Sequence, residues 1–160
     1  MKITTELVDY KNEKQTSELL SLLNKYATDP MGGASELGEY SKTNLITELL
    51  KRPYVFSVIC YVDDKPAGFS NCIESFSTFK CKPIINIHDF AVNAEFRGLQ
   101  LSQVLLSKIE DVANQKGCCK ITLEVLEGNE AAKSAYIKAG FKGYELDPAM
   151  GRALFWEKPL

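Results

Sequence analysis

The run from Ile84 to Lys116 is predicted to form a strand, a tight turn and a helix, and this unit restricts the folds open to the chain. Its first part is a nearly unbroken series of apolar residues: Ile84, Ile85, Ile87, Phe90 and Val92. Such a series is typical of a strand that is buried on both faces of a sheet. Apolar residues then recur at spacings of three and four, which predicts an amphipathic helix before Gly117: Leu101, Leu105, Ile109 and Val112. A buried strand that leads into an amphipathic helix favours an α/β fold.

Two features of this unit indicate a binding site. Three polar residues interrupt the apolar strand, and the interruption needs a reason: Asn86, His88 and Asp89. The helix is predicted to begin just after Arg97 and Gly98. Backbone N–H groups at a helix N-terminus lack partners within the helix, and together with the helix dipole they attract phosphate. Because Arg97 adds a positive charge, the sequence predicts an anion site at this turn.

The other segments read as further strands and helices in a mixed α/β order, β-α-α-β-β-β-α-β-α-β-β. Outside the central unit the predicted elements are a strand over Lys2–Val8, a helix over Glu13–Lys25, a second helix capped by Ser41 that ends before Pro53, a hairpin of Tyr54–Val62 and Ala67–Phe76, a strand over Cys118–Val125, a short helix after Asn129, and two short strands over Phe141–Leu146 and Ala153–Glu157.

Length and composition indicate one folded domain without a nucleic-acid or membrane partner. The 160 residues correspond to one domain of ~100 to 200 residues, and the hydrophobic share of 45% is average for a soluble protein. The net charge of −2 and the absence of a Lys/Arg cluster disfavour nucleic-acid binding. The longest apolar run, Tyr54–Val62, is too short to span a bilayer, and acidic residues stand where a secretory signal needs an apolar core. We therefore expect a cytoplasmic protein.

Two blocks in the C-terminal half resemble the Gcn5-related N-acetyltransferase (GNAT) superfamily. The segment Arg97–Ser102 is similar to the family's Gln/Arg-x-x-Gly-x-Gly/Ala turn, with Gln100 and Ser102 at the two small-residue positions. The segment Asn129–Phe141 resembles the family's N-x-x-A-x-x-x-Y-x-x-x-G-F pattern at matching spacing. The resemblance implies one N-acetyltransferase domain over residues 1–160, with a GNAT-like mixed central sheet.

The resemblance also implies the activity and the donor site. The activity is transfer of an acetyl group from acetyl-coenzyme A, as acyl donor substrate, to a primary amine by direct attack and without a metal. The implied acceptor is a small-molecule or peptide amine, and a homodimer is one oligomeric state to test. Contacts to the donor are implied for the strand backbone at Phe90, Ala91 and Val92, for the phosphate turn at Arg97, Gly98, Leu99, Gln100, Leu101 and Ser102, and for Asn129. The Gln100 side chain stands where the backbone must approach phosphate closely.

Acid–base chemistry has two candidate residues. Tyr136 matches the family tyrosine that protonates the leaving thiolate; the alternative is a core residue on a helix face. His88 lies at or beside the position of the family's catalytic glutamate and is a base for the amine, or else a structural histidine. Strand alternation places Asp89 on the opposite face from His88, so only one of them would face the acceptor. Asn129 is equally well read as the N-cap of the short helix.

Two questions stay open at the level of sequence. The loop Thr28–Tyr40 and the helix start carry Asp29, Glu36 and Glu39 against a single Lys42, which either favours a cationic acceptor or only forms a solvated acidic loop. The alternative function is a non-catalytic acyl-coenzyme A binding or sensing module with the same fold. A dinucleotide-binding Rossmann domain is disfavoured, because no G-x-G-x-x-G turn follows a strand.

Overall fold

The computed structural model describes all residues from 1 to 160, and the chain divides into two compact units, Met1–Leu123 and Glu124–Leu160. The elements of the first unit are β1 (Ile3–Leu7), α1 (Glu13–Thr28), η1 (Pro30–Gly32), α2 (Glu39–Leu50), β2 (Val55–Val62), β3 (Lys65–Ser77), β4 (Lys82–Val92), η2 (Ala94–Phe96), α3 (Leu101–Gln115) and β5 (Lys120–Leu123). The predicted mixed α/β fold is confirmed. The assignment of residues 1–160 to a single domain stays a prediction.

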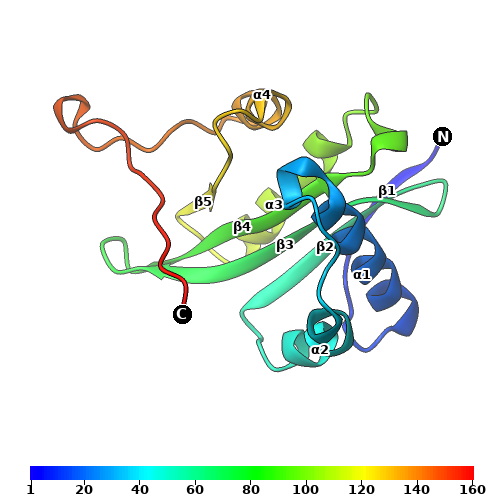
Figure 1. Cartoon of the computed structure of the whole chain (residues 1–160). Helices are drawn as coiled ribbons and strands as arrows, with labels where there is room; N and C mark the ends of the chain where they lie inside the picture. Colours follow the sequence, from blue (N-terminus) through cyan, green and yellow to red (C-terminus); the bar gives the residue numbers. More distant parts are fainter. The chain divides into compact units, whose positions relative to one another are not determined.

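One five-stranded sheet in the order β1-β2-β3-β4-β5 organises the first unit (Figure 1). Neighbouring strands are antiparallel from β1 to β4, whereas β4 and β5 are parallel and are connected through α3. The hairpin between β2 and β3 turns at Asp63 and Asp64, whose φ angles of 47° and 62° are left-handed. Two left-handed residues in succession form the hairpin turn whose twist matches that of the strands. The predicted hairpin is confirmed, although β3 begins at Lys65 and not at Ala67.

The sheet is covered by α1 and α2 on one face and by α3 on the other (Figure 1). Leu19 and Leu22 of α1 pack with Ile59 and Phe69 of the sheet. On the other face, α3 buries the stripe that its spacing predicts: Leu101, Leu105, Leu106, Ile109, Val112 and Ala113. Gly68 allows this packing, since a Cβ there would lie 3.3 Å from Leu105 Cδ1 of α3 and 2.8 Å from the carbonyl oxygen of Ala91. The central strands are thus held rigidly between two apolar layers.

Helix α2 begins earlier than predicted. Its N-cap is Gly38 and not Ser41, and the cap makes no side-chain hydrogen bond. Ser41 lies inside the first turn, where Glu39 supplies the negative charge that a helix N-terminus favours. The prediction failed because Ser is a good cap in isolation, whereas the extended backbone at Gly38 places the helix start three residues earlier.

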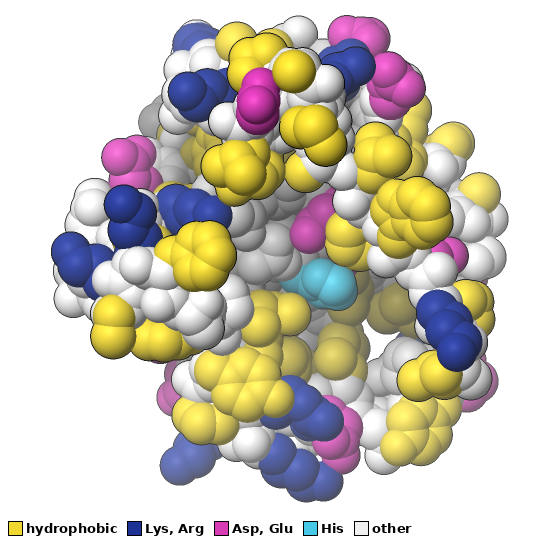
Figure 2. Space-filling model, turned by 90° about the vertical axis from the view of Figure 1, so that its left-hand side faces the viewer, with side chains coloured by type: hydrophobic (Ala, Val, Ile, Leu, Met, Phe, Trp, Pro, Cys, Tyr) yellow, Lys and Arg dark blue, Asp and Glu magenta, His cyan; other side chains and the backbone are white.

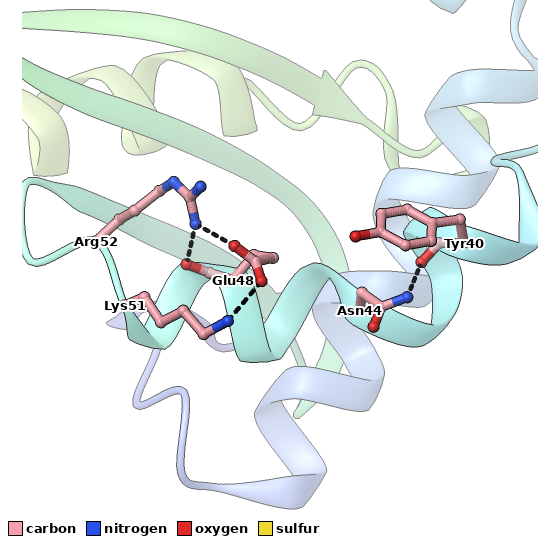
Figure 3. Close-up of polar contacts among 5 residues, drawn as sticks. All are labelled: Tyr40, Asn44, Glu48, Lys51 and Arg52. Atoms are coloured by element: carbon pink, nitrogen blue, oxygen red, sulfur yellow. Dashed lines mark hydrogen bonds and ion pairs between the residues drawn. The ribbon is translucent and has the colours of Figure 1, made fainter.

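Polar contacts end α2 before Pro53 (Figure 3). Arg52 Nη1 donates to both the carbonyl oxygen and the carboxylate of Glu48, each at 2.7 Å, and Lys51 Nζ reaches the same carboxylate at 2.7 Å. These bonds lower the pKa of Glu48. One turn from the start of the helix, Asn44 donates to the carbonyl oxygen of Tyr40 at 2.8 Å. Of the two cations, only Arg52 also reaches a backbone carbonyl in the last turn, that of Glu48, which accepts the Lys51 N–H as well.

The second unit contains α4 (Glu130–Lys138) and η3 (Pro148–Met150). The two strands predicted over Phe141–Leu146 and Ala153–Glu157 are not formed, and a single bridge joins Glu145 to Arg152 in their place. The segment has the residue types of a strand, but its large side chains are exposed, with Leu146 at 86% and Trp156 at 82%. A two-stranded hairpin without a buried face is marginal, which explains the missing ladder. No helix of either unit has the length and apolar character needed to cross a membrane.

Candidate active site

A β-bulge at His88 shapes the middle of β4. Asn71 of β3 lies opposite Asp89, and the next residue, Cys72, lies opposite Ile87, so His88 is an extra residue on β4. His88 is exposed (Figure 2) and Asp89 is half-buried. A bulge bends its strand and re-aims side chains, and bulges are common beside active sites. The prediction that His88 and Asp89 point to opposite faces assumed unbroken alternation, and the bulge removes that assumption.

Strands β4 and β5 part next to this bulge. The parallel ladder runs from Ile84 opposite Lys120 to Ile87 opposite Leu123 and stops there. Strand β4 continues to Val92 and pairs with β3 along this stretch, where Gly68 lies opposite Val92. The predicted donor contacts at Phe90, Ala91 and Val92 therefore lie on the part of β4 that extends beyond the ladder with β5.

The turn before α3 has the backbone of an anion site. Gly98 has a φ of 83°, and Gln100, the N-cap of α3, has φ 58° and ψ 24° in the left-handed region. The Gln100 side chain makes no capping hydrogen bond to the helix. Arg97, just before Gly98, is extended. The N-terminus of α3 that follows carries unpaired N–H groups and the positive end of the helix dipole, which attract anions. The predicted donor contacts at Arg97, Gly98, Leu99, Gln100, Leu101 and Ser102 lie on this turn and stay predictions.

Arg97 is tied to the end of α1. Its side chain is 64% exposed, and Nη2 lies 3.5 Å from Oδ2 of Asp29. A second exposed pair joins the same regions, with Lys25 Nζ 3.9 Å from Oε1 of Glu95. Exposed ion pairs contribute only ~0 to 1 kcal/mol, so the Arg97 guanidinium can exchange Asp29 for a phosphate at small cost.

Sequence reasoning missed the polar residues that hold Asp89. Asn71 Nδ2 donates to Asp89 Oδ2 at 2.9 Å, and Ser57 Oγ donates to Asn71 Oδ1 at 2.6 Å. Asn71 is 7% exposed and Ser57 is 0% exposed. The available signal was the presence of two polar residues inside strands that are otherwise apolar. Their meaning depends on which strands are neighbours, which the sequence alone does not state.

The acidic loop beside α1 is largely neutralised by ion pairs. Lys42 Nζ lies 2.8 Å from the carboxylate of Glu36 and 3.3 Å from that of Glu39, and the Lys42 hydrogen bond lowers the pKa of Glu36. Asp29 has Arg97 as its partner. Burial raises the pKa of the Tyr26 hydroxyl, and the charges of Asp89 and Asp29 raise it further. The two cations leave one of the three loop carboxylates uncompensated, and Asp89 on β4 forms no ion pair at all.

Asn129 and Tyr136 lie in the second unit. Asn129 Oδ1 accepts from the backbone N–H of Ala132 at 3.2 Å, which confirms its role as the N-cap of α4. Tyr136 is buried, and its ring meets that of Phe141 edge to face at 5.9 Å. Gly140, with a φ of 91°, returns the chain so that Phe141 N–H bonds the carbonyl oxygen of Tyr136 at 3.0 Å. The contacts of both residues with a donor stay predictions.

The comparison with protein families decides which group this architecture represents. The model of the acetyltransferase (GNAT) family matches residues 17–141, which is most of the chain. The chain belongs to the GNAT family. The match runs from α1 through β4 and the α3 turn to the end of α4, and it includes both blocks that resemble the family in sequence.

Individual GNAT relatives and structures agree with this assignment. The chain is 31% identical over 96 residues to the thialysine N-epsilon-acetyltransferase of Bos taurus, covering 60% of this chain and 53% of the relative. It is 29% identical over 99 residues to an uncharacterised N-acetyltransferase of Methanocaldococcus jannaschii, covering 61% and 44%. The chain thus spans about half the length of these relatives. The solved structure of AAC(6')-Iy with the bisubstrate analogue CoA-S-monomethyl-acetylneamine has the same fold, with a TM-score of 0.77, 15% identity and full coverage of both chains.

Proposed function

We propose that this GNAT protein is an N-acetyltransferase that moves an acetyl group from acetyl-coenzyme A to a primary amine by direct attack. The observation that carries the proposal is the family match together with the left-handed turn at Gly98 and Gln100, which precedes an intact helix N-terminus. The parting of β4 from β5 beside the His88 bulge supports the same reading.

The donor supplies an acetyl group activated as a thioester, and the chain supplies its binding site. Backbone N–H groups from Arg97 to Ser102 bind the diphosphate, and the Arg97 side chain adds charge. The β4 backbone at Phe90, Ala91 and Val92 receives the pantetheine arm, with Asn129 as a further contact. Fixing the donor along a strand held between two apolar layers orients the thioester carbon for attack.

In this proposal, one side chain acts as general base and another as general acid. The amine nitrogen bonds to the acetyl carbon while the C–S bond breaks, so the nitrogen must lose a proton and the sulfur must gain one. His88 accepts the proton of the amine, directly or through a water molecule. The Tyr136 hydroxyl donates a proton to the leaving sulfur. No covalent intermediate with the protein is required.

The acceptor is proposed to be a small-molecule or peptide amine. The bovine relative acts, by its name, on the ε-amine of thialysine, which favours a lysine-like amine as the first acceptor to test. The test is release of free thiol from acetyl-coenzyme A in the presence of a panel of primary amines. We expect thiol release that depends on both the protein and one class of amine. Saturable donor binding without amine-dependent thiol release from any acceptor would favour the acyl-coenzyme A binding module instead.

A further inference from the structure

A row of buried polar side chains crosses three strands and ends at Asp89. Ser57 of β2 lies opposite Asn71 of β3, and Asn71 lies opposite Asp89 of β4, so the three side chains share the face of the sheet that α1 covers. Tyr10, in the connection before α1, begins the row with its hydroxyl 2.8 Å from Ser57 Oγ. The row thus leads from the loop before α1 to the bulge that presents His88.

The hydrogen bonds along this row are all donated in the same direction, from Tyr10 toward Asp89. Asn71 Nδ2 donates to Asp89 Oδ2, so the amide oxygen of Asn71 is left to accept from the Ser57 hydroxyl. The Ser57 hydroxyl has one hydrogen, which it donates to Asn71. The hydrogen bond between Tyr10 and Ser57 must therefore be donated by the Tyr10 hydroxyl. Every donor of the row therefore points toward the Asp89 carboxylate. An amide does not pass protons along such a chain, so the row holds a charge in place and does not conduct protons.

Asp89 differs from the carboxylates around it because it forms no ion pair. Asp29 pairs with Arg97, Glu95 with Lys25, and Glu36 and Glu39 with Lys42. The hydrogen bond to the Asp89 side chain comes from a neutral amide, and the second carboxylate oxygen, Oδ1, has no protein partner. A half-buried carboxylate without a cation is costly unless something positively charged binds it.

We propose that Asn71 and Ser57 are positioning residues that hold the Asp89 carboxylate so that its Oδ1 binds the ammonium group of the acceptor. The inference rests on the proposed function. The docked ammonium first loses one proton to solvent water, and His88 then takes the second proton as the nitrogen bonds to the acetyl carbon and Tyr136 protonates the leaving sulfur. The inference assigns the acceptor class as a cationic amine and locates its recognition at Asp89 on the sheet, not at the acidic loop. Primary amines are mostly protonated at neutral pH, so the abundant form of the acceptor is the one that binds.

The test is calorimetric titration of the protein, saturated with coenzyme A, with cadaverine, a lysine-like diamine. Since coenzyme A carries no acetyl group, binding is measured without turnover. The neutral diol of the same chain length serves as the ligand control. The variants are Asp89→Asn, Asn71→Leu, Ser57→Ala and the conservative Ser57→Thr. Thr16→Val is the matched protein control, because Thr16 is a buried hydroxyl residue of α1 whose bond goes to the carbonyl oxygen of Glu13, away from the row.

We expect Asp89→Asn to weaken cadaverine binding by about tenfold or more, because the charged partner is gone. Asn71→Leu and Ser57→Ala should weaken cadaverine binding by about three- to tenfold. Each variant retains the Asp89 carboxylate but removes a hydrogen bond that fixes its position. Ser57→Thr should restore affinity, and Thr16→Val should equal wild type even if it is less stable. The diol should bind no better to wild type than to Asp89→Asn.

Two results would overturn the inference. One is cadaverine binding that is absent from wild type or unchanged in Asp89→Asn. The other is Asn71→Leu and Ser57→Ala binding as wild type does, which would make the row purely structural. The proposed function is judged separately by thiol release: cadaverine that binds through Asp89 without thiol release from any amine contradicts the function alone, and thiol release with affinity insensitive to Asp89 contradicts the inference alone.

Discussion

The guanidinium Nη2 of Arg97 lies 3.5 Å from the carboxylate Oδ2 of Asp29, which connects the phosphate turn before α3 to the end of α1. The other oxygen of Asp29 accepts the N–H of Met31 at 2.9 Å, so the carboxylate is fixed by its own turn. The Arg97 side chain therefore has an anionic partner whose own position is fixed by the chain that follows α1.

The pairing of Arg97 with Asp29 predicts different effects on donor affinity when each of the two residues is replaced. Arg97→Ala should weaken acetyl-coenzyme A binding by about three- to tenfold, since backbone amides keep much of the contact and one charged bond is lost. Asp29→Asn should leave affinity unchanged or strengthen it, because the competing anion is removed. The shift of melting temperature with donor concentration measures both. Stronger binding by Arg97→Ala would contradict the assignment of the turn.

Gln100→Gly should stabilise the protein and tighten donor binding. Gln100 is held at φ 58°, a conformation that costs a residue with a Cβ about 1 kcal/mol and glycine little. Removing the side chain also lets the diphosphate approach the backbone more closely. Urea unfolding and calorimetry measure the two effects, with Gly98→Ala, at φ 83°, as the control expected to lose stability. Loss of stability in Gln100→Gly would show that contacts of the glutamine side chain stabilise the protein by more than the positive φ angle costs.

Tyr136→Phe should lower kcat by about 10²-fold, the usual contribution of general acid catalysis, with donor affinity unchanged. The ring contact with Phe141 is kept, so the melting temperature should stay close to that of wild type. Tyr144→Phe, an exposed tyrosine of the same unit, is the matched control. Full turnover by the Tyr136→Phe variant would remove Tyr136 from the chemistry.

His88→Gln should abolish the acidic limb of the kcat/KM profile. A general base must be unprotonated to accept a proton, so activity falls as the pH drops through its pKa. Histidine is the residue type that changes charge between pH 5 and 8, and this chain has only one. The profile is measured on the best amine from the panel. An acidic limb of the same shape in the variant would assign the base to another group.

The buried thiols predict a loss of stability at high pH. Burial raises the pKa of Cys60 to about 11 and that of Cys72 to about 12, against ~8.5 for a thiol in an unfolded chain. Below pH ~8.5 both states are protonated and the stabilisation is complete. Above it, the unfolded chain loses protons that the folded state retains, so each thiol costs up to ~1.4 kcal/mol per pH unit.

Unfolding midpoints between pH 8 and 10 test this effect against a Cys60→Ala, Cys72→Ala double variant, whose slope should be shallower. In the native protein iodoacetamide should modify the exposed Cys81 and spare Cys60 and Cys72. Equal slopes in the two proteins, or rapid native-state modification of Cys72, would contradict the burial.

Residue patterns within short segments predicted the helices, strands and caps that depend mainly on neighbouring residues. The spacing of Leu101, Leu105 and Ile109 located α3 to within two residues at each end, and the residue types of Tyr54–Val62 and Ala67–Phe76 located the first hairpin. Asn129 as N-cap was read from its residue type and position. The strand predicted over Cys118–Val125 was right in place but is limited to Lys120–Leu123.

Features that depend on distant partners were missed. The bond from Asn71 to Asp89 joins residues 18 positions apart and follows from a register shift that leaves no trace in either strand alone. Leu154 and Trp156 have the residue types of a strand, but strand formation needs a partner and a buried face. The ion pair of Arg97 with Asp29 spans 68 positions and likewise depends on the tertiary fold.

The most direct test of acetyl transfer is parallel measurement of free thiol and acetylated amine, together with the intact mass of the protein after incubation with acetyl-coenzyme A alone. We expect thiol and acetylated amine in equal amounts, both requiring the amine, and a protein of unchanged mass. Acetyl-coenzyme A that binds but yields neither product with any primary amine, or a protein that becomes acetylated before the amine is added, would contradict it.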